Sequence, residues 1–327
     1  MDVQVDAAPD AGPAADRPIR YVCMPGSPYT GSTLLGMLLG NHPACATIGA
    51  ATGLTRRVDL ATYECSCGLR FMDCPFWAQV ARRTVELGRP VTVFKKDFWN
   101  THVRMSRSRS INGVLVSSLR SRALTEARDA VLASWGPIRR RIDEARASSS
   151  SLARAVLDVT GKDVFVDTAR DHQRPRHLFG TPGLDVRVIH LVRDPRGNVA
   201  SILKHTGVPV RKAARQWRHY NREADRTLAS MPSGSWMRLR YEDLCRAPQE
   251  TVERVAAFIG VEPVPVDDLL GPSVRHVIGN SMRLRALEGI REDLSWRQTL
   301  TPADLYTIGH IVEDTSRRMG YGWPWDD

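Results

Sequence analysis

The chain has 327 residues, of which 42% are hydrophobic and 25% are charged, proportions that exclude a wholly disordered protein. Its 46 basic and 36 acidic residues give a formal charge of +10, which favours an anionic partner such as a nucleic acid, a membrane surface or a charged small molecule. The sequence matches no zinc finger, basic zipper or aromatic-rich RNA-binding strand. We therefore predict no nucleic-acid partner.

Residues 1–18 consist mainly of Ala, Asp and Pro, and we expect them to form a disordered tail. They carry acidic residues where a signal peptide carries basic ones, and they contain no apolar segment. The densest apolar run, residues 34–39, is much shorter than the roughly 18–20 residues that cross a bilayer. Six cysteines in a chain of this length do not indicate a disulfide scaffold. These features predict a cytoplasmic protein with no integral membrane segment.

Strand-like and helix-like patterns alternate along the rest of the chain. Short apolar or alternating runs predict strands at residues 19–24, 164–166, 186–192 and 236–241. Amphipathic patterns predict helices at residues 32–40, 195–205, 210–231, 248–259 and 302–319. A mostly helical inserted region is expected over about residues 105–151, ending in the serine tract 148–151. This alternation predicts a single α/β domain over residues 19–327, with a central parallel sheet flanked by helices.

The sequence Gly-Ser-Pro-Tyr-Thr-Gly-Ser-Thr at residues 26–33 joins the first predicted strand to the first predicted helix. Glycines five residues apart allow backbone N–H groups to surround an anion at the positive end of a helix. Ser32 stands where an ATP-binding P-loop has the lysine that reaches the β- and γ-phosphates. The segment therefore predicts a P-loop-like nucleotide-binding fold and argues against an ordinary kinase. A tight turn that only packs helix on strand is the alternative.

Arg193 follows a predicted buried strand, at the edge where open α/β sheets bind their ligands. Ser201 comes eight residues later, about two turns into the following predicted helix. An arginine and a helical hydroxyl can together hold a second phosphate through hydrogen bonds. The alternative is a structural salt bridge at the helix start formed by Asp194 and Pro195.

These two segments resemble the sulfotransferases that use 3′-phosphoadenosine 5′-phosphosulfate (PAPS). Further segments similar to bacterial members of that family occur in order at residues 166–170, 240–248 and 276–283, and the cysteine-containing residues 65–77 are similar to a subset of it. The resemblance extends from about residue 20 to the C-terminus. It implies transfer of a sulfuryl group from PAPS to a hydroxyl or amine of a small-molecule or carbohydrate acceptor, with no metal required.

The resemblance also implies roles for individual residues. Arg193 and Ser201 are expected to bind the 3′-phosphate, over which Arg283 closes. Arg170 and Tyr29 are the expected catalytic residues, because each could stabilise negative charge on the bridging oxygen. The residues expected to bind the 5′-phosphosulfate are Gly26, Ser27, Tyr29, Thr30, Gly31, Ser32 and Thr33.

Two positions depart from the family pattern. Many relatives have Lys or Arg at the position of Tyr29, and many have Glu, which deprotonates the acceptor, at the position of Ala50. A non-catalytic nucleotide-binding protein therefore stays open as an alternative, as does a P-loop phosphotransferase. His102 and His172 are further candidates for the general base because they lie near predicted strand ends.

Three cysteines raise the possibility of a metal site. Cys65, Cys67 and Cys74 could supply three thiolates to zinc, with Cys45 or His42 as a fourth ligand. Their C-x-C-x₆-C spacing differs from the paired C-x₂-C of zinc knuckles. We therefore expect reduced cysteines that pack a loop, and no metal.

Overall fold

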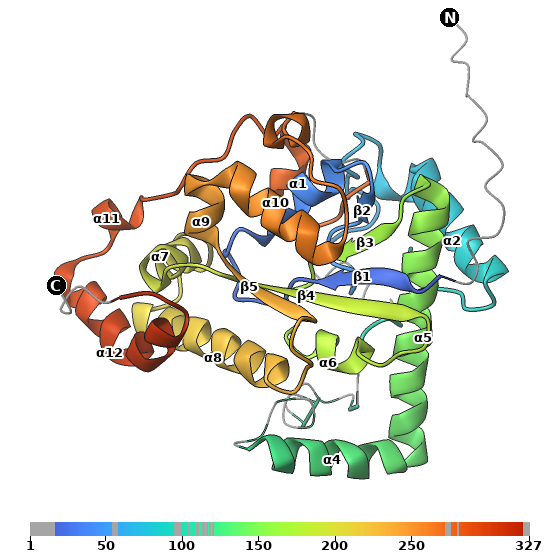
Figure 1. The fold of residues 1–327 in the computed structure, drawn as a ribbon, viewed down its shortest axis with the longest axis horizontal. Coiled ribbons are helices and arrows are strands. Elements are labelled where there is room, and N and C mark those ends of the chain that lie inside the picture. The colour runs from blue at the N-terminus through green and yellow to red at the C-terminus, as the bar shows by residue number, and fades with distance from the viewer. Residues whose placement is uncertain are drawn as a thin grey trace, which may run out of the picture.

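Figure 1 shows the fold in a computed structural model that describes residues 17–322. Within this range it leaves out residues 54–57, 95–99, 104, 107, 109–110, 113–114, 116, 118, 120, 272–275 and 280. The tail predicted over residues 1–18 therefore lies outside the described residues, apart from its last two positions. Among the residues that the structure describes, no helix has both the length and the apolar character needed to cross a bilayer.

Five parallel strands form one sheet in the order β2-β3-β1-β4-β5. Their bounds are β1 Ile19–Cys23, β2 Cys45–Thr47, β3 Val164–Asp167, β4 Leu184–Val192 and β5 Trp236–Arg240. In the centre, Val22 of β1 lies opposite Val166 of β3 and Arg187 of β4. The predicted α/β fold with a central parallel sheet is confirmed. Strand β2 was not predicted, because three residues are too few to show a pattern.

Helices cover both faces of the sheet (Figure 1). On one face, α1 (Ser32–Asn41), α9 (Tyr241–Arg246) and α10 (Pro248–Ile259) share a hydrophobic cluster with Val22 and Val166. On the other face, α2 (Pro75–Glu86) and α5 (Gly136–Thr160) pack with Tyr21 and Phe165. Residues of β1 therefore alternate between the two clusters, as expected for a strand buried on both faces.

A third hydrophobic cluster forms at the end of β4. It joins α7 (Pro195–Thr206), α8 (Val210–Leu228) and α12 (Pro302–Arg318) around the buried indole of Trp217. The Trp217 side chain also donates a hydrogen bond to the backbone oxygen of Arg193, at 3.0 Å. The shorter elements are α6 Arg174–Leu178, α11 Trp296–Thr299, and the 3₁₀ helices η2 Phe71–Asp73, η3 Val266–Leu269 and η4 Ser281–Leu284.

The helical region before β3 extends further than predicted. It contains α4 (Arg122–Ser134) and α5, and α5 runs through residues 148–151 to Thr160. The expectation that the serine tract ends this region is therefore wrong. The hydroxyl of Ser149 donates to the backbone oxygen of Ala145 at 2.6 Å, and Ser150 bonds in the same way to Arg146. These bonds satisfy polar side chains inside the helix, so the tract does not interrupt it.

Candidate nucleotide-binding site

A cavity of about 600 Å³ lies at the C-terminal edge of the sheet. Its walls come from the loop before α1, the segments that follow β3 and β4, Tyr241 at the end of β5, and the C-terminal segment over residues 282–293. The volume is within the usual range for sites that bind small molecules. Four arginines and two carboxylates line the cavity, so its charge is positive: Arg170, Arg193, Arg285 and Arg291 with Glu288 and Asp293.

The two glycines of the loop before α1 serve different purposes. A Cβ at Gly26 would lie 2.9 Å from the backbone oxygen of Leu191, so this glycine lets the loop approach β4 closely. Gly31 has a φ of 90°, and a Cβ there would lie 2.5 Å from the ring of Tyr241. Because Gly31 is the N-cap of α1, the first N–H groups of this helix have no capping side chain and are available to an anion.

The loop residues divide between those that line the cavity and those that shape the loop. Ser32 and Thr33 line the cavity at the first turn of α1. Ser27 and Thr30 are fully buried beneath it. The Ser27 hydroxyl donates to the side-chain oxygen of Asn198 at 3.2 Å, and the Thr30 hydroxyl donates to the backbone oxygen of Ser27 at 3.1 Å. Ser27 and Thr30 were predicted to bind the anion, but their side chains stabilise the loop and do not line the cavity.

Arg193 and Ser201 are in contact on the cavity wall. One terminal nitrogen of Arg193 donates to the hydroxyl of Ser201 at 3.2 Å and to the backbone oxygen of Tyr29 at 3.1 Å. The other donates to the backbone oxygen and the carboxylate of Asp293, at 3.2 and 3.1 Å. The guanidinium also lies 4.6 Å from the ring centroid of Tyr241. Arg193 therefore joins the loop before α1 to α7 and to the C-terminal segment.

Asp293 is a carboxylate inside a largely positive cavity. Burial alone would raise its pKa, but hydrogen bonds from Ser295 and Arg193 outweigh burial and hold the pKa below its usual range. Its side chain is 47% exposed, against 8% for that of Arg193. An anionic ligand that binds Arg193 would have to replace this carboxylate. Neither Asp293 nor Tyr241 was predicted as a site residue, because no local pattern marks them.

Tyr29 and Arg170 both line the cavity, on different elements. Tyr29 has a φ of 63°, which is uncommon outside glycine, and its ring stacks on that of His205 at a centroid distance of 4.9 Å. Arg170 follows β3 and is exposed to solvent. The structure thus brings together the two predicted catalytic residues, and their roles stay predictions. His205, at the end of α7, is a lining residue that the sequence analysis missed.

Arg283 does not line the cavity. Its side chain is buried and donates to the backbone oxygens of Glu64 and Gly279, at 2.6 and 3.0 Å. Its guanidinium lies 4.5 Å from the ring centroid of Tyr63. The structure therefore does not bring Arg283 to the predicted phosphate site, and Arg285 of the same segment lines the cavity instead.

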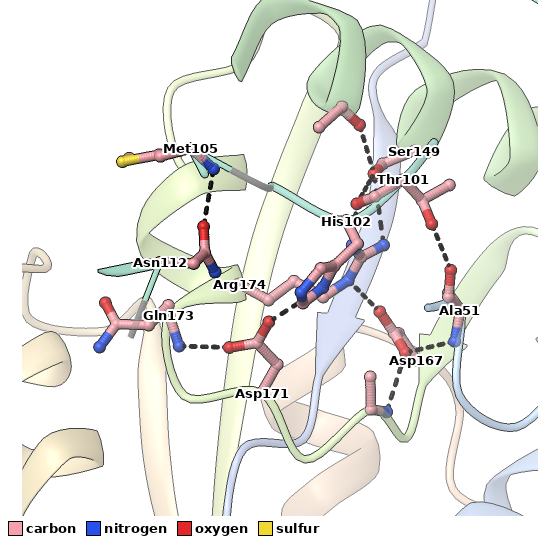
Figure 2. A network of polar contacts seen from close by, with 12 residues as sticks. Ala51, Thr101, His102, Met105, Asn112, Ser149, Asp167, Asp171, Gln173 and Arg174 are labelled. Carbon is pink, nitrogen blue, oxygen red and sulfur yellow. Dashed lines mark hydrogen bonds and ion pairs between the residues drawn. The ribbon is translucent and has the colours of Figure 1, made fainter. Parts of the chain in front are cut away.

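The segment that carries Arg170 is anchored by a buried polar network (Figure 2). The Asp167 carboxylate at the end of β3 accepts hydrogen bonds from the backbone N–H groups of Ala51 and Ala169, each at 2.9 Å. It also accepts from the Arg174 guanidinium and from the hydroxyl of Tyr21. The network fixes both ends of residues 168–173.

The two histidines considered as general bases lie next to this network. His102 pairs with Asp171, with 3.5 Å between Nδ1 and the carboxylate (Figure 2). His172 lies 4.0 Å from the carboxylate of Glu223. Burial holds the pKa of His172 below its usual value, because the opposing effects of the Asp171 and Glu223 carboxylates are smaller. Neither histidine is among the residues that line the cavity. Their role as bases stays a prediction.

The three candidate zinc ligands of the sequence analysis do lie together. Cys65, Cys67 and Cys74 form one group with His276, a residue that was not considered as a ligand. His42 is engaged elsewhere, since its Nε2 lies 2.9 Å from the backbone oxygen of Glu262.

Part of the chain matches a known protein family. Residues 182–265, which include β4, α7 and β5, match the profile of the sulfotransferase family. Carbohydrate sulfotransferase 5 of Mus musculus is 24% identical over 172 residues, which cover 44% of this chain and 44% of that protein. Carbohydrate sulfotransferase 1 of Mus musculus is 33% identical over 132 residues, which cover 33% of this chain and 29% of that protein. The chain thus spans less than half the length of these curated relatives.

A solved structure agrees with the sequence matches. The sulfotransferase domain from the curacin biosynthetic pathway has a TM-score of 0.51 and 16% identity, over 94% of this chain and 99% of that one. At this level of identity the likeness concerns the fold. Residues 182–265 therefore match the sulfotransferase family, and the chain as a whole has the fold of a sulfotransferase domain. The predicted P-loop-like fold is confirmed, and the matches support the predicted family.

Proposed function

We propose that this protein transfers a sulfuryl group from PAPS to a hydroxyl or amine of a carbohydrate or other small molecule. The proposal is carried by one observation: the open N-terminus of α1 and the Arg193–Ser201 pair lie in the same cavity. PAPS has anionic groups at both its 5′ and its 3′ positions, and the cavity offers a positive region for each. The similarity to carbohydrate sulfotransferases supports a carbohydrate acceptor.

Each end of the donor has its own binding groups in this proposal. The first N–H groups of α1, with the hydroxyls of Ser32 and Thr33, bind the 5′-phosphosulfate at the positive end of the helix. Arg193 and Ser201 bind the 3′-phosphate, which replaces the carboxylate of Asp293. ATP lacks a 3′-phosphate, so this second site would be left without its ligand.

The chemical step requires little beyond positioning and electrostatics. The acceptor atom attacks sulfur in line, the bond from sulfur to the bridging oxygen breaks, and that oxygen leaves with the electron pair on adenosine 3′,5′-bisphosphate. The proton of the acceptor passes to a base or to water. Arg170 stabilises the charge that grows on the bridging oxygen, and the phenol of Tyr29 donates a hydrogen bond there. The phenol of Tyr29 is neutral and supplies no positive charge. If Arg170 does not supply it either, the protein binds the nucleotide without transferring the sulfuryl group.

We also propose that the reaction takes place in the cytoplasm. None of the six cysteines, all of which the structure describes, forms a disulfide, which suits a reducing compartment.

The direct test is turnover with a panel of acceptors. The full chain is incubated with PAPS and with mono- and oligosaccharides, alcohols and amines, and adenosine 3′,5′-bisphosphate is quantified by chromatography and the product by mass spectrometry. We expect bisphosphate release that depends on the acceptor and is lost in Arg170→Ala. Tight binding of the bisphosphate with no product from any acceptor would favour the non-catalytic alternative. Phosphate transfer from ATP would favour the phosphotransferase.

A further inference from the structure

Four metal-ligating side chains from two distant segments meet beside η4. Cys65, Cys67 and Cys74 lie on the segment that leads into α2, and His276 lies between η3 and η4, some 200 residues later. The three Sγ atoms and a ring nitrogen of His276 all lie within 4.8 Å of one another. The function proposed above uses none of these side chains.

Three of the six distances between the ligand atoms are known individually, and they match a tetrahedral zinc site. The Sγ atoms of Cys67 and Cys74 are 3.7 Å apart. Nδ1 of His276 lies 3.2 Å from Sγ of Cys74 and 3.7 Å from Sγ of Cys65. Zinc with bonds of about 2.3 Å to sulfur and about 2.0–2.1 Å to nitrogen places tetrahedral sulfur ligands about 3.8 Å apart, and nitrogen about 3.5 Å from sulfur. These three separations agree within a few tenths of an ångström, and the other three do not exceed 4.8 Å.

The elements around the cluster hold three of the four ligands in place. Cys74 is the N-cap of α2, so the start of that helix sets its position. Cys65 is fully buried, and its backbone N–H donates to the backbone oxygen of Leu69 at 2.8 Å. The ring of Phe76 stacks on His276 at a centroid distance of 4.3 Å and 10°, which fixes the plane of the imidazole.

We infer that Cys65, Cys67, Cys74 and His276 bind one zinc(II) ion. The three cysteines each release a proton to solvent as a zinc–sulfur bond forms, His276 binds as neutral imidazole, and no atom changes oxidation state. Four protein ligands fill the tetrahedron, so the role of the ion is structural rather than catalytic. The C-x-C-x₆-C spacing did not predict this site, because the fourth ligand comes from a segment that only the fold brings close.

The ion would connect residues 63–74, which carry the three cysteines, to the segment that begins at His276 and continues into the cavity-lining residues 282–293. The same two segments are already joined by the backbone N–H of Val277, which donates to the Ser66 hydroxyl at 2.9 Å, and by that of Gly279, which donates to the Tyr63 hydroxyl at 2.8 Å. Residues 282–293 of the C-terminal segment line the nucleotide cavity. Zinc would therefore hold one wall of the cavity in place.

Elemental analysis of the full chain tests the site. Protein purified with a reducing agent and without added metal is expected to contain one equivalent of zinc. Cys74→Ser and His276→Asn are expected to lose most of it, and asparagine tolerates the left-handed backbone at position 276, where φ is 69°. Cys245→Ser, on α9, is the matched control and should keep its zinc. Iron in place of zinc, or equal zinc content in all variants, would overturn the assignment.

A second measurement covers the case in which the variants fail to fold. The unaltered chain is stripped with a chelator and refilled with Co²⁺, and tetrahedral thiolate ligation would give intense visible bands and sulfur-to-cobalt charge-transfer bands. Chelation should lower the melting temperature and added Zn²⁺ should restore it. Mass spectrometry under non-reducing conditions that finds a Cys67–Cys74 disulfide, or a melting temperature that chelation leaves unchanged, would contradict the inference.

Discussion

The side chains of Arg174 and Arg193 are both buried, with exposed fractions of 4% and 8%, but their charges are balanced in different ways. Arg174 bonds to the wholly buried carboxylate of Asp167 and to the backbone oxygen of Thr101. Arg193 lines a cavity, and the carboxylate that it contacts, on Asp293, is about half exposed. One arginine belongs to a closed network and the other faces a space that a ligand can enter.

The difference separates a structural arginine from a binding one. Removing one partner of a buried ion pair leaves an uncompensated charge and costs several kcal/mol. An ion pair with an exposed carboxylate contributes little, because water replaces it readily. We therefore expect changes around Arg174 to alter folding and changes around Arg193 to alter nucleotide binding.

The largest effect is expected from breaking the closed network. Asp167→Ala leaves Arg174 buried without its counter-charge and should lower the free energy of unfolding by about 3–5 kcal/mol. Urea denaturation followed by circular dichroism measures this loss. The double variant Asp167→Leu with Arg174→Met removes both charges and should recover much of it. A loss below about 1 kcal/mol in the single variant would mean that the network is not a closed ion pair.

The next largest effect should be on turnover, with folding unchanged. Arg170 is exposed, so Arg170→Ala should keep the melting temperature while kcat falls by roughly 10²–10³-fold, as for loss of one preorganised donor. Tyr29→Phe is the matched comparison, since it keeps the ring that stacks on His205 and should cost less. The interpretation would be wrong if only Tyr29→Lys showed sulfuryl transfer.

Arg193→Ala should have a moderate and selective effect. Loss of a charge-assisted donor costs roughly 1.5–3 kcal/mol, so the affinity for adenosine 3′,5′-bisphosphate should fall by roughly 10- to 100-fold by calorimetry. The affinity for 5′-AMP should change little, because that ligand lacks the 3′-phosphate. Ser201→Ala should act in the same direction and more weakly. Equal losses for both nucleotides would make Arg193 structural, like Arg174.

The smallest effect is expected at Asp293, and it is a gain. Asp293→Asn removes the carboxylate that competes with a phosphate for Arg193. The affinity for adenosine 3′,5′-bisphosphate should rise about two- to five-fold, which corresponds to about 0.5–1 kcal/mol, the range for a partly exposed ion pair. Added salt should reduce this gain, because it screens exposed charges. An unchanged or weaker affinity would show that the carboxylate helps to orient Arg193.

Local patterns predicted most of the elements and the contact between Arg193 and Ser201. The end of a strand and the start of the next helix are marked by neighbouring residues. Arg193 follows β4 and Ser201 lies on α7, the next helix, so their contact depends on one short stretch of the chain. The sequence could not predict which arginine of the C-terminal segment enters the cavity. Arg283 and Arg285 are two residues apart, and the contacts of Arg283 with Glu64 and Tyr63 come from a segment more than 200 residues away.

The central claim is that the cavity recognises a nucleotide by its 3′-phosphate. Isothermal titration of the unaltered chain with adenosine 3′,5′-bisphosphate, 5′-AMP and ATP with Mg²⁺ tests it most directly. The account predicts that the bisphosphate binds at least about tenfold more tightly than 5′-AMP, since a charge-assisted phosphate contact contributes roughly 1.5–3 kcal/mol, and that ATP binds more weakly than the bisphosphate. Equal affinities for the bisphosphate and 5′-AMP, or preferential binding of ATP, would contradict it.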